Sequence, residues 1–338
     1  IESAIIKEQK LNRKQMSVPE FRTACHNYAQ KYIDIQMEGF KRIGVLADWE
    51  HPYKTMDPGF EAEEVKVFGE MYKKGYIYKG LKPVYWCPND ETALAEAEIE
   101  YQDDPCTTVY VKFQMKDDQG KLAAYDHSKL FFVIWTTTIW TLPGNLAIAL
   151  HPDESYALVK APNGETYIMA EALVEKVMKV GGFESWEIAE THPGSFFENM
   201  LAQHPFLDKT SRLLLADYVT MDSGTGCVHT APGFGADDYQ TCLRYGMDMV
   251  VPVDDQGRHT DYAGKYAGMK TEESNPVILA DMKESGALFA CEEIVHSYPH
   301  CWRCKKPIIF RATPQWFCSV DAFKDEACAA CDDVRWVP

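Results

Sequence analysis

The chain has 338 residues, of which 46% are hydrophobic and 25% charged, and its formal net charge is −17 at pH 7. This composition is ordinary for a globular protein, and the length predicts about two domains. No apolar run approaches the ~20 residues that span a bilayer, so we expect no membrane partner. The acidity argues against a large phosphate-binding surface, because nucleic-acid binders usually carry a basic patch.

Eleven cysteines are scattered irregularly along the chain. An odd number in a long chain favours reduced thiols over a disulfide framework, and therefore predicts a cytoplasmic protein. The first residue is Ile1 rather than Met, so we expect a piece of a longer chain.

Residues 1–47 are predicted to be mostly helical. A turn is predicted further along, at Asp57-Pro58-Gly59. A second helix is predicted over Glu61–Lys79. Aromatic and aliphatic residues recur along one stripe of this helix, which is more typical of a core face than of cofactor contacts. The stripe consists of Val65, Phe68, Tyr72 and Tyr76.

From Thr107 the pattern changes to strands, beginning with a half-buried one in which Val109, Val111, Phe113 and Met115 alternate with other residues. Further strands are predicted over 130–135, 156–160, 166–170, 212–215 and 249–253. Helices are predicted over 170–180, with Gly181 after its end, and from Asn275-Pro276 to about Gly286. We therefore predict an α+β, β-rich fold with a β-barrel-like core and peripheral helices over about 105–290.

The stretch Phe131–Asn145 holds the first candidate site. An apolar strand ends in Thr136, Thr137 and Thr138, and a turn follows at Leu142–Asn145. Three hydroxyls at the end of a buried strand can bind a polar ligand. The alternative is that β-branched threonines simply suit a strand, and the pattern alone favours that alternative.

A second candidate site follows Gly224-Thr225-Gly226, where glycines allow a ligand to approach the backbone closely. An isolated His229 would be interpreted as a satisfied core histidine. Asp237 and Asp238 open a short helix predicted over 236–245, and the helix dipole accounts for one of the two carboxylates. Cys227 precedes His229 by two residues, so on a strand both would share a face and a cysteine nucleophile is one alternative. Nothing in the sequence resembles a Ser–His–Asp triad.

Cys301-x-x-Cys304 is half of a zinc pattern, and Cys87-x-x-Asp90 stands where the other half would be. Zinc bound by three cysteines and an aspartate is unusual for a structural site. The alternative is a pair of surface thiols beside a turn.

Three blocks together resemble the isoleucyl-tRNA synthetases, members of the class I aminoacyl-tRNA synthetases. Residues 135–143, WTTTIWTLP, are similar to that family's WTTTPWTLP, with Ile139 in place of proline, so the local turn is expected to differ. Residues 224–239, GTGCVHTAPGFGADDY, are similar to GTGxVHxAPGxGxDDY. The stretch from His296 to Phe317 resembles the segment where the family's chain re-enters its catalytic domain. Valyl and leucyl relatives carry Arg where Thr138 stands.

The resemblance implies the editing (CP1) domain that is inserted into the catalytic domain of these enzymes. It assigns 1–104 to a catalytic-domain stub and connecting segment, 105–290 to the editing domain, and 291–338 to a return segment with zinc-ribbon-like character. The implied reaction is hydrolysis of valine misattached to the isoleucine tRNA, with water as the nucleophile. The acidic charge then fits a fragment that handles only the aminoacylated 3′ end.

The resemblance also implies roles for individual residues. Trp135 and His229 would wall the pocket, the run Thr136–Thr138 would hold the terminal ribose and ester carbonyl, and Asp238 would bind the substrate's ammonium group. The loop Gly224–Gly226 would contact substrate, and the metal candidates are Cys87, Cys301 and Cys304.

Editing requires no cofactor, and a structural zinc is the one metal expected. ATP and Mg²⁺ would serve only the full-length enzyme, because neither a HIGH-type nor a KMSKS-type motif occurs here. The expected partners are the aminoacylated 3′ end of tRNA(Ile) and the rest of the synthetase, with the protein a monomer. Three alternatives remain: a complete synthetase, a non-catalytic module that binds the tRNA 3′ end, and a zinc-ribbon interaction protein.

Overall fold

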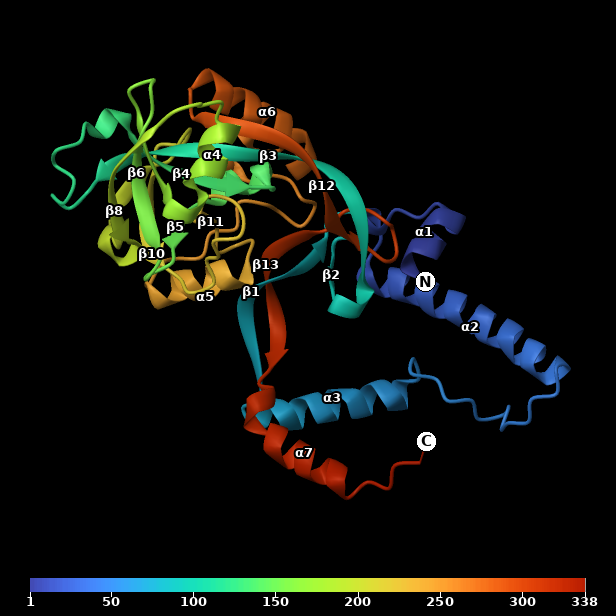
Figure 1. Cartoon of the computed structure of the whole chain (residues 1–338). Coiled ribbons are helices and arrows are strands. Elements are labelled where there is room, and N and C mark those ends of the chain that lie inside the picture. Colours follow the sequence, from blue (N-terminus) through green and yellow to red (C-terminus); the bar gives the residue numbers. More distant parts are fainter. Residues whose placement is uncertain (338) are drawn as a thin grey trace. The chain divides into compact units, whose positions relative to one another are not determined.

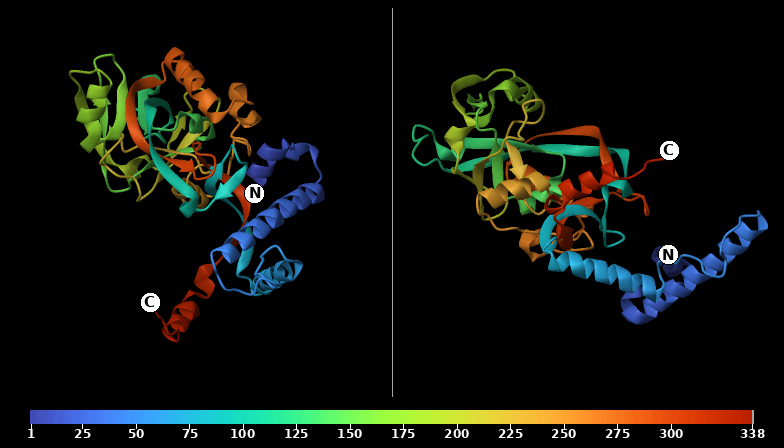
Figure 2. Two further views of the ribbon diagram at one scale, coloured as in Figure 1. Left: turned by 90° about the vertical axis from the view of Figure 1, so that its right-hand side faces the viewer. Right: turned by 90° about the horizontal axis from the view of Figure 1, so that it is seen from below.

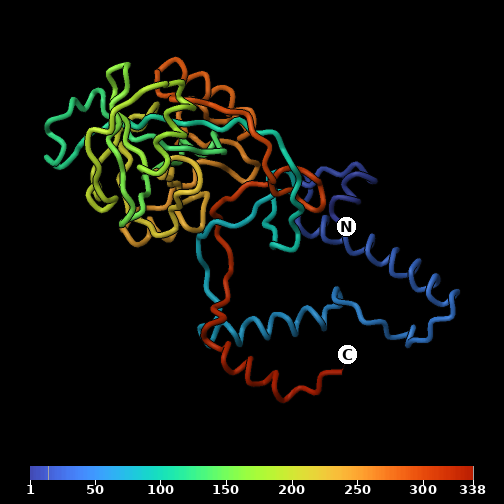
Figure 3. The backbone as a smooth tube through the Cα atoms, in the orientation of Figure 1, coloured from blue at the N-terminus to red at the C-terminus, as the bar shows by residue number. Residues whose placement is uncertain are grey.

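The computed structural model describes residues 1–337, with only the backbone described at Lys14. The chain divides into two compact units, one formed by Lys79–Gln315 and the other by Ile1–Tyr78 with the segment that begins at Trp316. The chain passes between the units along two paired strands, β1 (Ile77–Cys87) and β13 (Ile309–Cys318) (Figure 3). No helix of the described chain is long and apolar enough to cross a membrane.

The smaller unit is helical. Ser17 caps its longest helix, because the Ser17 hydroxyl accepts from the backbone of Glu20 while the Glu20 carboxylate accepts from the backbone of Ser17 at 2.9 Å. The helices are α1 (Glu2–Gln9), α2 (Val18–Arg42), α3 (Pro58–Lys73) and α7 (Lys324–Asp332), with the 3₁₀ turns η1 (Arg13–Gln15) and η8 (Val320–Ala322).

The prediction for α3 was wrong at both ends and on its face. The helix begins at Pro58, and Gly75, at φ +76°, closes it before β1 starts at Ile77. None of its residues is buried. Phe68 and Tyr72 instead meet the ring of Trp316 edge-on, at centroid distances of 5.4 and 6.4 Å.

The larger unit is built on strands (Figure 1). A small sheet has the order β13-β1-β2, and a ten-stranded mixed sheet has the order β12-β3-β9-β10-β5-β11-β4-β7-β6-β8. These strands are β2 (Thr92–Leu94), β3 (Ile99–Asp117), β4 (Leu130–Thr136), β5 (Ala147–Leu150), β6 (Ser155–Lys160), β7 (Thr166–Ala170), β8 (Glu187–Pro193), β9 (Leu201–Gln203), β10 (Thr210–Leu215), β11 (Val228–Thr230) and β12 (Leu288–Cys301).

The predicted β-barrel-like core is confirmed by an additional pairing between β3 and β4. This pairing closes the run β3-β9-β10-β5-β11-β4 into a ring, so these strands have neighbours on both sides. Val109, Val111, Phe113 and Phe132 are fully buried in its core. Two short strands, β5 and β11, pair antiparallel between β10 and β4 and bring His229 opposite Ile148.

A long antiparallel ribbon runs from the barrel, where β12 pairs with β3 from Leu288 to Cys301 (Figure 2). Helices α5 (Ala236–Arg244) and α6 (Thr271–Glu284) lie on opposite sides of this unit, and α4 (Val174–Val180) is shorter (Figure 1). Its 3₁₀ turns are η2 (Glu96–Glu98), η3 (His127–Lys129), η4 (Ile139–Gly144), η5 (Glu171–Leu173), η6 (Gly194–Phe197) and η7 (Asp261–Tyr266).

Three local predictions were wrong. Helix α6 begins at Thr271 rather than at Asn275-Pro276, because Lys270 adopts the cap conformation and Pro276 is accepted inside the helix at the loss of one backbone hydrogen bond. The residue with positive φ after α4 is Gly182 rather than Gly181. Residues 249–253 form no strand; only Val253 makes an isolated bridge, to His259.

Candidate functional site

Strand β4 ends at Thr136, and the threonine run then folds back through its own hydroxyls. The Thr136 hydroxyl accepts from the backbone N–H of Thr138 at 3.0 Å, and the Thr141 hydroxyl donates to the Thr138 carbonyl at 2.7 Å. These bonds bend the chain into η4, which starts at Ile139. The hydroxyls of Thr137 and Thr138 are then free of the sheet and lie 3.4 Å apart.

Three cavities surround this run. The Asp238 cavity, about 240 Å³, is lined by Thr136, Thr138, His229 and Asp238 among others. The glycine-loop cavity, about 280 Å³, is lined by Trp135, Thr136, Thr137, Gly224, Thr225, Gly226 and His229 among others. The α6 cavity, about 440 Å³, lies against Thr137, Thr138 and the first turns of α6. All the catalytic and substrate-binding residues predicted from the sequence therefore line the first two cavities.

The glycine loop requires its glycines. Gly224 and Gly226 have φ of +70° and +71°, and a Cβ on Gly226 would lie 2.4 Å from the Cβ of Ala170. Between them, the buried Thr225 accepts at its hydroxyl from the Cys227 N–H at 3.2 Å, and its carbonyl accepts from Ala170 at 2.9 Å. The Thr225 side chain therefore shapes the loop.

His229 is buried and both of its ring nitrogens have partners. The Asn145 amide nitrogen lies 2.8 Å from Nδ1, and the Thr141 hydroxyl lies 3.1 Å from Nε2. Because the Asn145 amide donates and the Thr141 hydrogen goes to the Thr138 carbonyl, the proton of the ring sits on Nε2. Burial, helped by the charge of Lys209, lowers the pKa of His229 to about 3. The ring is therefore a neutral, fixed wall rather than an acid or base.

Asn145 and Ser211 fix that wall, and neither was singled out from the sequence. The Ser211 hydroxyl donates to the Asn145 carbonyl oxygen, which directs the amide nitrogen to His229 and, at 2.9 Å, to the Ala147 carbonyl. Both residues are fully buried. Asn145 ends the predicted turn, and that position could have marked it as a structural residue. Nothing in the sequence around Ser211 indicates its hydrogen bond to Asn145.

A buried histidine and a half-buried lysine hold the end of η4. His204 Nε2 donates to the Leu142 carbonyl at 2.9 Å, and Lys209 Nζ donates to the Pro143 carbonyl at 2.7 Å. Burial lowers the pKa of His204 to about 3 and that of Lys209 to about 8. Cations suit the carbonyl end of a helical turn, so Lys209 stabilises the turn that follows the threonines.

Asp238 lies in the first turn of α5, and its carboxylate accepts from the Ala231 N–H at 2.8 Å. Burial raises its pKa to about 6 against the lowering effect of that bond, with Asp237 adding to the rise. Asp237 itself is exposed. No residue of the described chain forms an ion pair with Asp238 within 4.0 Å, so no cation of the described chain neutralises its carboxylate.

Cys227 is not equipped as a nucleophile. Burial raises the pKa of its thiol well above the usual value, and Sγ faces the Ile168 carbonyl at 3.8 Å. A reactive cysteine needs its thiolate stabilised, and no cation among the described residues lowers the pKa of this thiol.

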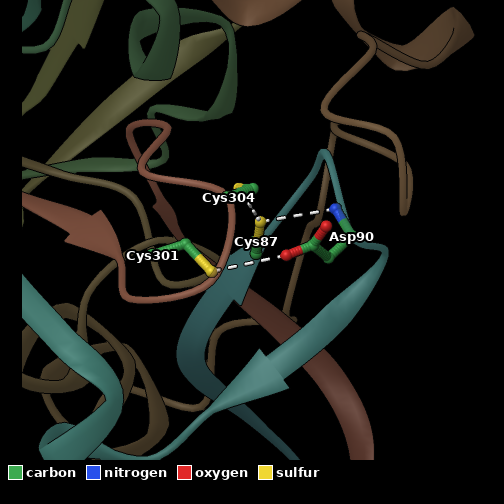
Figure 4. Close-up of side chains that lie close together, drawn as sticks. All are labelled: Cys87, Asp90, Cys301 and Cys304. Carbon is green, nitrogen blue, oxygen red and sulfur yellow. Dashed lines mark hydrogen bonds between the residues drawn. The ribbon is translucent and has the colours of Figure 1, made fainter. Parts of the chain in front are cut away.

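A separate cluster joins Cys87, Asp90, Cys301 and Cys304 (Figure 4). One ligand atom from each lies within 4.8 Å of all the others; Cys87 Sγ is 3.5 Å from Cys304 Sγ, and Cys301 Sγ is 3.4 Å from Asp90 Oδ2. Thiolates at ~2.3 Å from one tetrahedral ion would be separated by similar distances, so these residues fit Zn²⁺. Cys87 and Cys301 are fully buried, which contradicts a pair of surface thiols.

A family model described as "tRNA synthetases class I (I, L, M and V)" matches residues 1–338. The chain belongs to the class I tRNA synthetases. It is 53% identical over 340 residues to the isoleucine–tRNA ligase of Caldicellulosiruptor bescii and 54% identical to that of Caldicellulosiruptor saccharolyticus, covering 100% of this chain and 37% of each relative. The chain thus spans somewhat more than a third of the curated relatives it matches.

Editing domains of leucyl-tRNA synthetases are among the solved structures similar to this synthetase chain. That of the cytosolic enzyme of P. knowlesi has a TM-score of 0.42 and 12% identity, covering 57% of this chain and 97% of that one. That of P. falciparum has a TM-score of 0.41 and 11% identity, covering 54% and 98%. Because these TM-scores are low, we base the description of the fold on the strand pairing alone.

Proposed function

We propose that this site hydrolyses the ester between valine and the 3′ end of the isoleucine tRNA. The observation that carries the proposal is Asp238, a carboxylate without an ion-pair partner on the wall of a small cavity. Among the described residues lining this cavity, none is Lys or Arg, so the charge is suited to an ammonium group such as that of an aminoacyl ester.

The cavity is suited to sorting by size. Isoleucine exceeds valine by one methylene, a difference worth only about 1–3 kcal/mol in a single site, which is why such enzymes use a second, hydrolytic sieve. This pair of amino acids is the standard illustration of that limit. His229 is held through both ring nitrogens, so the wall that would meet the larger side chain cannot swing aside.

The reaction needs no covalent intermediate. Water adds to the ester carbonyl carbon, the bond from that carbon to the ribose oxygen breaks, and one proton of the attacking water passes to the ribose oxygen, which releases valine and the free ribose hydroxyl. The hydroxyls of Thr137 and Thr138 would hold the ribose and carbonyl, Asp238 would hold the ammonium group, and orientation would supply much of the rate. Cys227 and His229 take no part in proton transfer, because one is an unreactive thiol and the other has both nitrogens engaged.

The test is deacylation by the pure chain. Valyl-tRNA(Ile) should be hydrolysed at a rate well above that in buffer, while isoleucyl-tRNA(Ile) should be spared. Binding of both esters without hydrolysis would identify a non-catalytic module that binds the tRNA 3′ end. ATP-dependent activation of isoleucine, together with the Mg²⁺ that this step requires, is expected only from a longer synthetase that contains this chain.

The Cys87–Asp90–Cys301–Cys304 cluster supports a second proposal, a structural Zn²⁺ that ties β1 to the end of β12. The purified chain should contain about one zinc per molecule, measured by elemental analysis, and Cys301→Ser should lose it. Chelation should lower the unfolding temperature of the parent, because a metal bound only by the folded state stabilises that state. A zinc-free chain whose unfolding temperature is indifferent to added zinc would contradict this assignment.

A further inference from the structure

Lys209 is a charged side chain that the reaction described above does not use, although it is anchored beside the site. It lies in the loop between β9 and β10, where its carbonyl accepts from the His204 N–H at 2.9 Å and from the Gln203 side-chain amide at 3.0 Å. These bonds fix the backbone from which the side chain extends. At its other end, Nζ donates to the Pro143 carbonyl at 2.7 Å.

The ammonium group of Lys209 has no acidic partner. No carboxylate of the described chain lies within 4.0 Å of it. Asp208, the residue before it, and Asp261, beside Tyr262, are both exposed. Its second contact is the Tyr262 ring, whose centroid lies 5.0 Å from Nζ. A half-buried cation without an anion costs free energy of folding, so the charge is retained at this expense for a role at the carbonyl it contacts.

The Pro143 carbonyl receives from Lys209 a hydrogen bond that its own turn does not supply. In a continuing 3₁₀ helix this carbonyl would accept from the N–H of Leu146, three residues further on. The Leu146 N–H instead donates to the Thr230 carbonyl at 3.0 Å, which joins the chain to β11. Lys209 therefore fixes the chain at the point where it leaves η4.

The fixed segment leads directly to the His229 wall. Two residues after Pro143, the Asn145 amide nitrogen lies 2.8 Å from His229 Nδ1. The charge of Lys209 also acts on the ring itself, because it helps to keep His229 neutral. A displacement of Pro143 would therefore change the position of the imidazole.

The same segment lies against a wall of the Asp238 cavity. A Cβ on Gly144, the residue after Pro143, would lie 2.7 Å from the Phe234 ring, and Phe234 lines that cavity. Packing this close leaves no room for the segment to shift without moving the ring.

We propose that Lys209 is a positioning residue for the deacylation: by holding the Pro143 carbonyl, its ammonium group fixes the segment that places the His229 wall. This rests on the proposed hydrolysis of valyl-tRNA(Ile). Lys209 itself touches no substrate and acts through Asn145 and His229 on the choice between valyl and isoleucyl groups. These groups differ by one methylene, so a small displacement of the wall is enough to weaken the discrimination.

The first experiment measures kcat/KM for valyl-tRNA(Ile) divided by kcat/KM for isoleucyl-tRNA(Ile). Lys209→Met keeps most of the stem and removes the ammonium group, and it should lower this ratio about tenfold, within the range that misplacement of a site by ~1 Å can cause. Lys209→Arg keeps a cation and should retain most of the parent ratio. A partly unfolded preparation lowers both rates alike, so a merely structural role would leave the ratio unchanged.

Lys121 supplies the matched control. It donates to the Phe196 carbonyl at 2.6 Å and lies 5.1 Å from the centroid of the Phe196 ring, and neither residue lines any of the three cavities. Lys121→Met therefore removes the same two kinds of contact away from the site and should keep the parent ratio. A ratio unchanged in Lys209→Met, or lowered equally in Lys209→Met and Lys209→Arg, overturns the proposal.

The pH dependence of the same ratio requires no variant that could fail to fold. Burial lowers the pKa of Lys209 to about 8, and the titratable groups around it are His204, His229 and Tyr262. The charge is present below that pH and is lost above it, so the parent ratio should fall about threefold between about pH 7 and 9, because a neutral amine is the weaker donor. The substrate's ammonium group titrates alike in Lys209→Arg, whose guanidinium stays protonated and whose ratio should stay level. Equal falls in the two proteins, or none in the parent, contradict the proposal.

A measurement without substrate separates this inference from the proposed function. NMR of the chain labelled with ¹⁵N-histidine gives the rate at which the His229 Nε2 proton exchanges with water. This rate should be about tenfold faster in Lys209→Met than in the parent, the loss expected for one hydrogen bond to a charged group, and unchanged in Lys121→Met. An unchanged rate in Lys209→Met, with a parent that deacylates, would reject only the role of Lys209. A parent that hydrolyses neither ester would reject deacylation, and the exchange rates would still decide whether Lys209 holds the ring.

Discussion

His229 is a single residue that forms a fixed wall of two cavities. His229→Ala should remove the imidazole from both cavities and leave room for another methylene, so the variant should hydrolyse isoleucyl-tRNA(Ile) at least tenfold faster than the parent. Both esters are assayed with both proteins. His259→Ala is the matched control, because His259 is equally buried but lines none of the three cavities. If His229→Ala spares the isoleucyl ester as fully as the parent does, another group sets the size limit.

Thr138 gives a second test at this scale, because it lines two of the cavities. Thr138→Arg introduces a long cation that must be paired or solvated, and it should crowd the ester and ribose. We expect at least a tenfold loss in the deacylation rate of valyl-tRNA(Ile). Thr191→Arg, on the exposed face of β8, controls for the added charge. Unchanged kinetics in folded Thr138→Arg would remove Thr138 from the site.

The sequence could predict the lining residues but not the partners of His229. The threonine run, the glycine loop and Asp238 lie in recognisable blocks, and they meet because β4 and β11 are neighbours. The hydrogen bonds that His229 makes with Asn145 and Thr141 hold the ring in place. Thr141 belongs to the 3₁₀ turn that begins at Ile139, where the family has proline and the sequence did not predict the local conformation. A lone Lys209 in a polar stretch gives no sign that it will be half-buried with its ammonium group on the Pro143 carbonyl.

At the scale of elements, one hydrogen-bond chain ties β10 to β11 and η4. It runs from Ser211 through Asn145 and His229 to Thr141. Ser211→Ala should leave the buried Asn145 oxygen unpaired and lower the free energy of unfolding by about 1–3 kcal/mol. Urea unfolding measures this, with the exposed Ser195→Ala as the control. A loss no larger than that of Ser195→Ala would mean that the amide of Asn145 finds another donor.

Elements with strong periodicity were predicted well, and the misses have local causes. Strands β3, β4 and β10 of the barrel were predicted from their apolar residues, whereas β5, β9 and β11, of three or four residues each, were missed. Residues 249–253 have the composition of a strand but only one bridging partner. Helix α6 starts before its Asn-Pro pair because the backbone of Thr271 donates to the Gly257 carbonyl, a contact between segments that no local signal contains. Val65, Phe68 and Tyr72 on α3 read as a core face but are exposed, apart from the contacts of Phe68 and Tyr72 with Trp316.

At the scale of the whole molecule, three buried groups set part of the pH dependence of stability. The pKa values of His204 and His229 fall from 6.5 to about 3, so the unfolded state binds more protons below pH 6.5 and these groups destabilise the fold as the pH drops. Asp238 acts oppositely, because its pKa rises from 3.8 to about 6 and the folded state holds the extra proton between those values.

Asp238→Asn should therefore steepen the loss of stability in acid. Between pH 4 and 6, its free energy of unfolding should fall with decreasing pH more steeply than the parent's, by on the order of 1 kcal/mol per pH unit. Urea unfolding at several pH values measures both slopes, with the exposed Asp237→Asn as the matched variant. Parallel slopes for Asp238→Asn and the parent would mean that Asp238 is not desolvated in the folded chain.

Binding of a valyl ester through its ammonium group in the Asp238 cavity, followed by hydrolysis, is the proposed function of this site. It is tested most directly by the rate of valyl-tRNA(Ile) deacylation for the parent, Asp238→Asn and Asp237→Asn. A charge-assisted bond of roughly 1.5–3 kcal/mol predicts that Asp238→Asn is about ten- to a hundredfold slower, with Asp237→Asn close to the parent. Equal losses in the two variants, or an Asp238→Asn chain that deacylates at the parent rate, would contradict the account.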